Sequence, residues 1–445
     1  MTDTAVRRRE ERRVLAGTLV GTTIEWYDFF IYAQAAGLVF GGLFFAPLGE
    51  TGAQIASWAS LGISFLFRPL GAVIAGHLGD RLGRKRMLVL TLVLMGLATS
   101  LIGVLPTYAD IGILATVLLV LLRVLQGFSA GGEWGGAALM SVEHAPEGKR
   151  GLFGAYPQIG VPIGMILATF TMWVLTSSMG QEAFLAWGWR LPFLFSIVLI
   201  VVGYVIRRSV EESPIFKELQ QRRSESSAPL ATLFRHHGRE VVLTALIFIA
   251  NNAAGYLLIA FFTTYVSTVI GMPRPTALLL TTLASFGWLI FTMVGGRISD
   301  RIGRVRTFQI GYALIAVWSI PMWFLIDTGN AALFFIALFV LTIGLGLSYG
   351  PQSALYAEMF PADVRYSGVS IGYALGAILG GAFAPLIAEL LLKSTGASWS
   401  IGVYVLVITI ISLVAVSLVK ETRGVPLDTH SVEVVAARTG ANRVR

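Results

Sequence analysis

The chain of 445 residues contains no cysteine, which excludes disulfides, thiol nucleophiles and thiolate metal sites. Charge is also scarce, because Asp, Glu, Lys and Arg make up 13% of the residues, where a soluble domain carries about a quarter. The sequence holds neither a two-histidine helical zinc motif nor a glycine-rich phosphate loop. We therefore expect neither an enzyme nor a metal or cofactor site.

Long apolar runs are what the chain has in place of charge. It is 55% hydrophobic, with a mean hydropathy of +0.75. Runs of about 20 residues, rising about 1.5 Å per residue in a helix, cross the roughly 30 Å of hydrocarbon in a bilayer. Alternating ten-residue strands, which a membrane β-barrel needs, are absent. We predict an all-α membrane protein with twelve transmembrane helices, over residues 15–45, 53–78, 87–105, 111–143, 151–178, 190–207, 241–270, 276–299, 307–326, 331–358, 366–392 and 399–419.

Positive charge is concentrated on one side of these spans. With twelve crossings both termini lie on the same side, and 28 of the 33 Lys and Arg residues fall in the two tails and in the loops on that side. Because basic loops stay in the cytoplasm, we predict a multi-pass protein of the cell membrane with both termini cytoplasmic. The net charge of +8 then reflects topology in a lipid bilayer, and we expect no nucleic-acid partner.

The chain repeats itself in two halves. "GHLGDRLGRKR" at 76–86 returns as "GRISDRIGRVR" at 296–306, and "EHAPEGKR" at 143–150 returns as "EMFPADVR" at 358–365. Parallel six-helix repeats on either side of a central path are typical of carriers, so a carrier is favoured over a channel. We predict five segments: a cytoplasmic tail (1–14), a six-helix bundle (15–208), a cytoplasmic loop (209–239), a second six-helix bundle (240–420) and a cytoplasmic tail (421–445).

The first repeated stretch resembles the hallmark of the major facilitator superfamily, G-x-L-x-D-R-x-G-R-K between the second and third helices. The matching residues are Gly76, Leu78, Asp80, Arg81, Gly83, Arg84 and Lys85. Within that superfamily, "IEWYDFFIY", "RVLQGFSAGGEWGGAAL" and "EESPIF" resemble the metabolite:proton symporter family. The resemblance covers residues 15–420 and implies two pseudo-symmetric six-helix bundles, alternating access and proton coupling, and we expect a functional monomer.

The resemblance leaves the substrate open, because importers of shikimate, α-ketoglutarate, citrate, and proline or glycine betaine share these motifs. We expect import of a small polar metabolite, an organic acid of the shikimate or dicarboxylate type, with protons as the coupling ion. A proton symporter for osmolytes such as proline and glycine betaine is the alternative. A proton-driven drug exporter ranks low, because Met165 stands where the exporters' fifth-helix pattern has proline.

Two carboxylates stand in the first apolar span. Glu25 lies 12 residues past Arg13, about 18 Å along a helix, and Asp28 and Tyr32 follow on the same face. An uncompensated charge at mid-bilayer costs about 3 kcal/mol or more, so each carboxylate needs a partner or a task. Two interpretations stay open: the acids couple protons to transport, or they hold an arginine in a structural ion pair.

Arg68 and Arg123 are the cations at comparable depth. We favour Arg68 as the ion-pair partner of the first-helix acids, and substrate binding is the alternative for this residue. Arg123 lies close to a helix face that Gln126 and Glu133 share. A guanidinium captures a carboxylate through two parallel hydrogen bonds, so Arg123 is the first choice for binding an anionic substrate. A network of Arg123 with Glu133 or Asp28 is the competing interpretation.

The second half has almost no charge at depth. Asn251 stands there where the first half has Glu25, counting from Arg239 and Arg13. This asymmetry predicts proton chemistry in the first half and neutral hydrogen bonding to substrate in the second. The substrate-binding candidates are Tyr32, Arg123, Gln126, Glu133, Gln158, Asn251, Tyr256, Tyr349 and Gln352. A polar residue in a membrane helix is often only a contact between helices, which is the alternative for each.

The repeated turns predict a gate on the cytoplasmic side. The resemblance implies that ion pairs and helix-dipole contacts between these turns close that side when the carrier faces outward. The gate candidates are Asp80, Arg81, Arg84, Glu143, Arg150, Asp300, Arg301, Glu358 and Arg365. The alternative is a signal for topology and turn geometry alone, but topology does not require the repeated acids.

Overall fold

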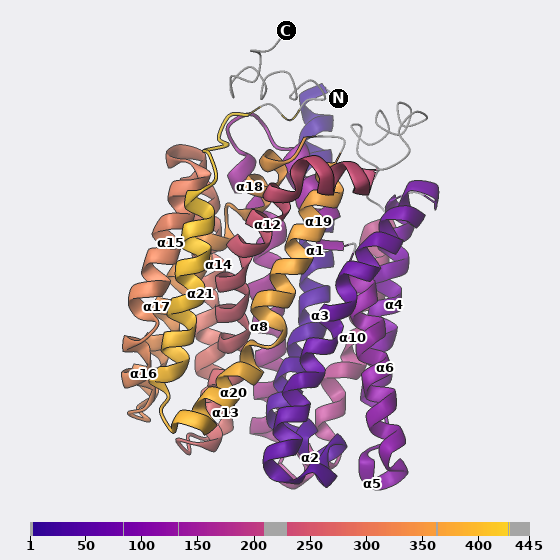
Figure 1. The fold of residues 1–445 in the computed structure, drawn as a ribbon. Helices are drawn as coiled ribbons and strands as arrows, with labels where there is room; N and C mark the ends of the chain where they lie inside the picture. Colours follow the sequence, from indigo (N-terminus) through magenta and orange to yellow (C-terminus); the bar gives the residue numbers. More distant parts are fainter. Residues whose placement is uncertain are drawn as a thin grey trace.

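The computed structural model describes residues 3–82, 84–131, 133–208, 229–361, 364–425 and 427, without the side chains of residues 3–10, 12, 75–88, 207, 208 and 229–232. Every regular element in these ranges is a helix, and the long helices run side by side along the molecule (Figure 1). This arrangement confirms the predicted all-α fold.

The first half makes six crossings. They are α1 (Asp3–Ala35) continued by η1 (Ala36–Phe40) and α2 (Gly41–Phe44), α3 (Gly49–Leu82), α4 (Arg84–Val104), α6 (Ile113–Ala130) with α7 (Glu133–Glu143), α8 (Arg150–Ser178) and α10 (Leu191–Arg208). Short helices occupy the turns: η2 (Ala46–Leu48), α5 (Tyr108–Ile111), α9 (Gln181–Ala186) and η3 (Gly188–Arg190).

The second half makes six more. They are α12 (Pro229–Tyr256) continued by η5 (Leu257–Phe261) and α13 (Phe262–Thr268), α14 (Arg274–Ile302), α15 (Arg304–Trp318) with α16 (Pro321–Ile326), α17 (Ala331–Tyr349) with α18 (Gln352–Met359), α19 (Arg365–Ala377) continued by η6 (Ile378–Ala382) and α20 (Ala384–Thr395), and α21 (Trp399–Ser417). The first helix begins and the last helix ends at the same end of the bundle (Figure 1). We call this the basic end.

Ten helical segments of the described residues are long and apolar enough to cross a bilayer. The other two predicted spans, 87–105 and 307–326, are helical over Arg84–Val104 and over Arg304–Trp318 and Pro321–Ile326. The crossing predicted over 307–326 is interrupted before Pro321, because proline has no N–H group to continue the helical hydrogen bonds. With these two, the helices account for the predicted twelve crossings.

Helix α12 begins inside the interval that the sequence predicts as a loop. It starts at Pro229 and bends at His237, where φ is −126° and ψ is 22°. The part before the bend runs across the basic end, and the part after it descends into the bundle (Figure 1). Residues 209–228, which hold the rest of the predicted loop, lie outside the described residues.

Glycines let α3 and α6 touch at their backbones. A Cβ atom on Gly127 would lie 1.9 Å from the carbonyl oxygen of Ser64, and one on Gly131 would lie 2.0 Å from that of Arg68. No side chain fits at either position, which agrees with the close approach expected of small residues in membrane helices. These two backbone contacts hold Ser64 and Arg68 of α3 against α6, the helix that carries Arg123.

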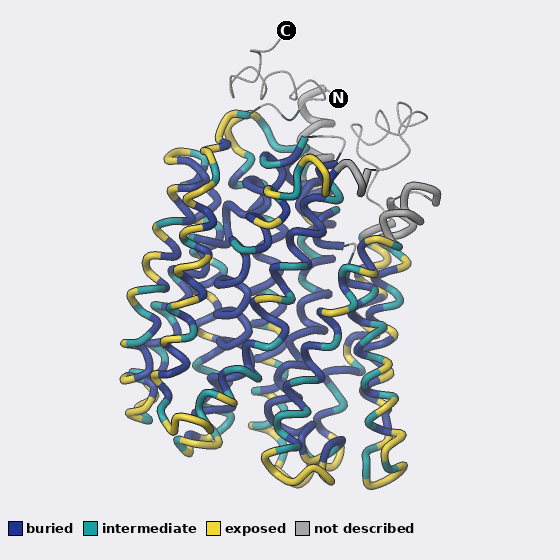
Figure 2. The backbone as a smooth tube through the Cα atoms, in the orientation of Figure 1, coloured by how far each residue is buried: buried dark blue, intermediate teal, exposed yellow. Residues whose placement is uncertain are grey.

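Polarity is distributed as in a membrane protein. Buried residues fill the middle of the bundle, and exposed ones lie on its outside and at its ends (Figure 2). The outside carries large apolar side chains, such as Val317 at 75% exposure and Phe324 at 63%, while charged Asp28 and Arg123 are buried. The outer surface therefore suits contact with lipid, and polar chemistry is confined to the interior.

We expect Gly127→Val to destabilise the protein, because the added side chain would collide with the α3 backbone; overpacking of this kind costs about 1–3 kcal/mol or more. Thermal unfolding of the detergent-solubilised protein measures the effect. Gly42→Ala is the matched control, since a Cβ on Gly42 meets nothing within 4 Å, and it should leave the unfolding temperature unchanged or slightly raised. Equal unfolding temperatures for the two variants would contradict the close crossing.

Candidate functional site

Asp28 is held by hydroxyl groups from two other helices. Asp28 is 1% exposed. Ser196 of α10 donates to Oδ1 over 2.6 Å, and Thr99 of α4 donates to Oδ2 over 3.0 Å. Among the described residues, Asp28 forms no ion pair. The carboxylate is solvated by neutral donors, so it can gain or lose a proton without breaking a salt bridge.

Arg123 directs its guanidinium into the first half. Nη2 donates to the carbonyl oxygen of Leu61 over 2.9 Å and to Ser64 Oγ over 2.6 Å. Nε donates to the carbonyl oxygen of Ser60 over 3.4 Å, and Nη1 donates to Gln126 Oε1 over 2.7 Å. These bonds use four of the five N–H groups of the side chain. The predicted first choice for the substrate carboxylate therefore has one N–H group left.

A chain of hydrogen bonds joins Arg123 to Asp28. Gln126 accepts from Arg123 and donates through Nε2 to Thr99 Oγ1 over 2.7 Å. Thr99 in turn donates to Asp28. The two predicted residues are thus connected through the neutral side chains of Gln126 and Thr99.

Tyr32 and Glu133 complete this cluster. The ring centroid of Tyr32 lies 3.7 Å from Arg123 Cζ, and the Tyr32 hydroxyl bonds Ser60 Oγ over 2.6 Å. Glu133 is 1% exposed, and its charge acts on Asp28. Tyr32, Gln126 and Glu133 are therefore gathered around Asp28 and Arg123.

Arg68 is surrounded by aromatic rings. Its Cζ atom lies 4.3 Å from the ring centroid of Phe29, 4.4 Å from that of Phe65 and 5.4 Å from that of Trp26. Glu25 and Arg68 are 1% and 2% exposed, and the charges of both act on Tyr256. Both residues therefore lie near Tyr256, at the boundary with the second half.

A small cavity lies between the halves, beside this group. Its walls are mainly aromatic, with Trp26 and Phe30 from the first half and Phe248, Tyr256, Trp288 and Tyr349 from the second. The centre of a water molecule can move through about 10 Å³ of the cavity, which is room for about one water. The carrier is therefore closed around an almost filled site.

Asn251 and Asn252 also line the cavity. Asn251 Nδ2 donates to the carbonyl oxygen of Leu345 over 3.0 Å and to Ser348 Oγ over 2.8 Å, and Asn252 Nδ2 donates to the carbonyl oxygen of Ala377 over 3.1 Å. The amide nitrogens thus tie α12 to neighbouring helices. The carboxamide oxygens of both side chains remain available to a ligand in the cavity.

Gln158 joins the halves on the basic side of the cavity. Its Nε2 lies 3.4 Å from Gln352 Oε1 and 3.3 Å from the carbonyl oxygen of Tyr349, and its Oε1 accepts from Trp134 Nε1 over 2.8 Å. The Trp134 ring stacks on that of Tyr373, with centroids 3.7 Å apart and planes 9° from parallel. Sequence reasoning missed Trp134 and Tyr373. The repeat contained the signal, since its alignment over 143–150 and 358–365 places them opposite Tyr349 and Gln158.

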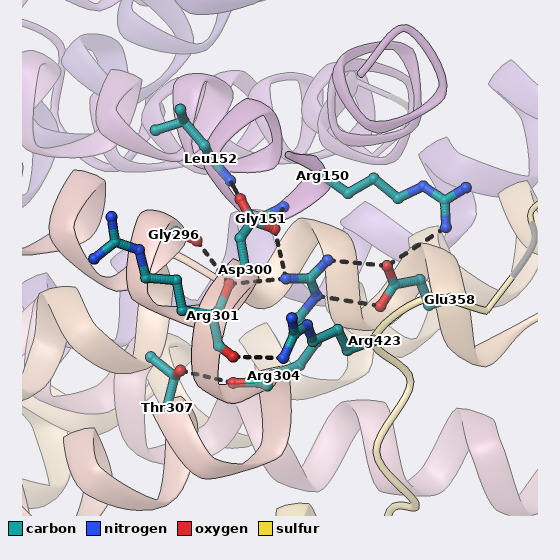
Figure 3. Close-up of polar contacts among 12 residues, drawn as sticks. Arg150, Gly151, Leu152, Gly296, Asp300, Arg301, Arg304, Thr307, Glu358 and Arg423 are labelled. Atoms are coloured by element: carbon teal, nitrogen blue, oxygen red, sulfur yellow. Dashed lines mark hydrogen bonds and ion pairs between the residues drawn. The ribbon is translucent and has the colours of Figure 1, made fainter. Parts of the chain in front are cut away.

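Asp300 joins the two halves at the basic end. It accepts hydrogen bonds from the backbone N–H groups of Gly151 and Leu152, over 2.8 and 2.9 Å, at the start of α8 (Figure 3). A carboxylate at a helix N-terminus satisfies free N–H groups and complements the helix dipole. Arg304 binds the same carboxylate over 2.7 Å.

Glu358 forms a second set of ion pairs at the basic end. Arg304 Nη2 lies 3.2 Å from its carboxylate and Arg150 Nη1 lies 3.8 Å from it (Figure 3). Arg365 and Glu143 face one another across the halves at 3.9 Å. The predicted residues Arg150, Asp300, Glu358, Arg365 and Glu143 are therefore brought together. The side chains of Asp80, Arg81 and Arg84 lie outside the described residues.

Several residues of this network were not predicted, among them Arg304, Glu421 and Arg423. Arg304 stands in the second copy of the turn where Arg84 stands in the first, so the repeat contained the signal. Glu421 accepts from the backbone N–H groups of Arg304 and Val305, over 2.8 and 3.1 Å, at the start of α15. The predicted Arg301 takes part through its carbonyl oxygen, which accepts from Arg423.

The other end of the interface is closed without charge. Gln34 Nε2 of α1 donates to the carbonyl oxygen of Ile259 in η5 over 2.9 Å. Thr282 of α14 donates to Thr169 of α8 over 2.7 Å. Polar contacts between described residues therefore join the halves at both ends of the interface.

The sequence matches the model of the Major Facilitator Superfamily over residues 18–378, so the chain belongs to this family of membrane transporters. It is 40% identical over 416 residues to the inner membrane metabolite transport protein YhjE of Escherichia coli, covering 92% of this chain and 94% of that protein. It is 37% identical over 426 residues to the shikimate transporter of Escherichia coli, covering 93% and 95%.

Other relatives widen the range of cargo. The glycine betaine/proline/ectoine/pipecolic acid transporter OusA of Dickeya dadantii is 32% identical over 426 residues, covering 94% of this chain and 84% of that protein. The proton:xylose symporter XylE, bound to 6-bromo-6-deoxy-D-glucose, has a TM-score of 0.77 at 18% identity, covering 96% and 99%. That likeness shows the fold. The chain is thus a multi-pass membrane transporter of small molecules and not an enzyme.

We expect Asp300→Asn to loosen the basic end, because the neutral amide loses the attraction to Arg304 and to the start of α8. The chain lacks cysteine, so a single Ser353→Cys label at the interface, buried in this structure, reports opening. Labelling by a maleimide should be about tenfold faster with Asp300→Asn, a shift of about 1.4 kcal/mol. Asp110→Asn, which alters the cap of α5, is the control. Equal labelling rates for Ser353→Cys alone, with Asp300→Asn and with Asp110→Asn would show that Asp300 does not hold the basic end closed.

Proposed function

We propose that this transporter carries a small organic acid into the cell together with protons, and that Asp28 is the group that carries the proton. The observation that supports the proposal is the pair of hydroxyl groups on Asp28, which hold the acid without a cation. Such an acid can take part in reversible proton transfer inside the bilayer.

The charge of the interior supports proton coupling. The described ionisable side chains buried between the two ends are Glu25, Asp28, Arg68, Arg123 and Glu133. With all of them charged, their sum is one negative charge, and one proton brings it to zero. A net charge in a low-dielectric interior is costly, and the carboxylate of a bound organic acid adds a second negative charge. One proton therefore lowers the charge of the loaded closed state from −2 to −1, which favours taking up the proton with the substrate.

The hydrogen bonds around Asp28 can change direction without loss. Thr99 Oγ1 lies 3.0 Å from the carbonyl oxygen of Met95 as well as 3.0 Å from Asp28. When Asp28 gains a proton on Oδ2, it can donate to Thr99, and Thr99 can donate to Met95 while it still accepts from Gln126. A hydroxyl group has one donor and two acceptor sites, so every bond is kept. Protonation of Asp28 therefore reverses the bond to Thr99 and leaves the bonds of Gln126 and Arg123 in place.

The remaining assignments follow the same proposal. Both termini and the basic end face the cytoplasm, in agreement with the distribution of Lys and Arg. The proton is the coupling ion, and no other cofactor takes part. One chain supplies both walls of the cavity, so the protein works as a monomer in the lipid bilayer.

A proton symporter for osmolytes is the second candidate. Its support is the aromatic wall of the cavity, since aromatic faces bind quaternary ammonium groups such as that of glycine betaine. One relative's name includes glycine betaine, at 32% identity, while the shikimate transporter is 37% identical. The organic acid remains the first choice.

We expect Asp28→Asn to abolish accumulation driven by a pH gradient and to spare exchange of substrate across the membrane. The amide keeps the size of the side chain and permanently lacks the charge, so the carrier moves substrate without a proton. Uptake of labelled shikimate into proteoliposomes, acid outside, measures accumulation, and counterflow measures exchange.

Glu182→Gln, an exposed carboxylate-to-amide change in α9, is the matched control and should leave both activities intact. Accumulation by Asp28→Asn at the level of the unaltered protein would exclude Asp28 as the proton carrier. Accumulation that does not depend on the gradient would exclude proton coupling altogether.

A further inference from the structure

We propose that Arg68, and not Arg123, binds the carboxylate of the substrate, and that this substrate is a ring-bearing monocarboxylate held between the aromatic walls of the cavity. The inference rests on the proposed function only in taking the substrate to be an organic acid. It assigns the anchor of that acid and narrows its class.

Arg68 has hydrogen-bonding capacity that the closed protein does not use. Its Nε and Nη2 atoms are buried and have no hydrogen-bond partner in the described part of the chain. A buried N–H group of a charged side chain without an acceptor is costly, so a ligand that supplies acceptors is favoured. The edge of the guanidinium that carries Nε and one Nη matches the two oxygens of a carboxylate.

Three neutral hydrogen-bond donors of the cavity wall are also buried without an acceptor among the described residues. Trp26 Nε1, Trp288 Nε1 and the Tyr256 hydroxyl are buried without a hydrogen-bond partner among the described residues. Tyr256 is 1% exposed, and the two tryptophans are 2% and 3% exposed. Indole N–H groups and guanidinium groups only donate, and a carboxylate only accepts. The set is therefore complementary to an anion.

The positions of these donors relate Arg68 to the cavity. The ring of Trp26 forms part of the cavity wall, and the Arg68 guanidinium lies 5.4 Å from its centroid. Phe65 lies between Arg68 and Tyr256, with its ring centroid 4.4 Å from Arg68 Cζ and 5.2 Å from that of Tyr256. A carboxylate at the edge of the cavity between Trp26 and Tyr256 can thus reach Arg68 when the halves separate.

The remaining cation does not offer a second anchor. Four of the five N–H groups of Arg123 are engaged within its own half. A dicarboxylate, which would place a second negative charge in the site, has no free guanidinium for it among the described residues. The site is therefore suited to one carboxylate.

The aromatic rings define the body of the substrate. Across the cavity, Tyr256 meets Trp26 and Phe30 with centroids 6.3 and 6.1 Å apart. A flat ring that enters between them replaces these contacts with offset or edge-to-face contacts of its own. The carboxamide oxygens of Asn251 and Asn252 can accept hydrogen bonds from hydroxyl groups on such a ring.

Calorimetric titration of the full chain in detergent, without any gradient, tests this inference. The probes are benzoate and cyclohexene-1-carboxylate, with succinate and glycine betaine as comparison ligands. Tyr256→Phe and Trp288→Phe each keep the ring and remove one donor, and Arg68→Lys keeps the charge and removes the paired N–H geometry. Trp189→Phe is the matched control, because Trp189 Nε1 is also buried without a partner but its ring packs on Phe40 and Phe193, away from the cavity.

We expect both ring acids to bind and the comparison ligands to bind at least about tenfold more weakly. Arg68→Lys should raise the Kd of benzoate about tenfold or more, and each of the two donor deletions about threefold to tenfold. Trp189→Phe should leave it within about twofold. If Arg68→Lys does not fold, the benzoate affinities of Tyr256→Phe and Trp288→Phe alone test the inference.

Three results would overturn the inference. They are unchanged benzoate affinity in Tyr256→Phe and Trp288→Phe, tighter binding of succinate or glycine betaine than of either ring acid, and no binding of either ring acid at millimolar concentration. Because binding is measured without a gradient, it is separate from coupling. Binding as expected with no accumulation in proteoliposomes would refute the proposed function and leave the anchor in place.

Discussion

The cost of holding charge inside a bilayer governs this protein. Its interior contains three acids and two arginines among the described residues buried between the two ends, and each must be compensated by a neighbour, a proton or a ligand. Arg123 is compensated by neutral acceptors and an aromatic ring, and Asp28 by two hydroxyl groups. The groups at Arg68 and around the cavity that have no hydrogen-bond partner among the described residues are the ones to which we assign the substrate.

The same constraint separates the two ends of the carrier. At the basic end, charged groups join the halves, with Asp300 on the start of α8 and Glu358 between Arg304 and Arg150. At the other end, amide and hydroxyl groups join them. Ionic contacts are strong at short range and weaken once water enters. The halves can therefore lock at one end and part at the other, which alternating access requires.

Much of the fold was predictable because hydrophobicity and charge act over whole segments. Twelve apolar runs predicted the helices, and the repeated turns contain residues that lie together at the basic end, where Arg150 faces Glu358 and Arg365 faces Glu143. The limit was local backbone conformation. The interruption before Pro321 and the helical start of α12 at Pro229 depend on how single turns pack, which no average over a segment records.

The charged residues of the site were predictable from the sequence, but most of their hydrogen-bond partners were not. Glu25, Asp28, Arg68 and Arg123 were evident as charges in apolar surroundings. Their partners were not, because Thr99, Ser196 and Ser64 are ordinary residues in membrane helices, and only the rotation of α3, α4 and α10 brings them to the charges. The stack of Trp134 on Tyr373 joins residues from different halves, so helical spacing within one span holds no information about it.

The most direct test of the account is whether binding of the acid takes up a proton at Asp28. Purified protein in weakly buffered, mildly alkaline detergent solution is mixed with benzoate, and a pH indicator reports protons taken from the solution. If Asp28 carries the proton, the unaltered protein takes up protons on binding benzoate and Asp28→Asn takes up none, with benzoate bound in both. Binding without proton uptake in the unaltered protein, or equal uptake by Asp28→Asn, would contradict the account.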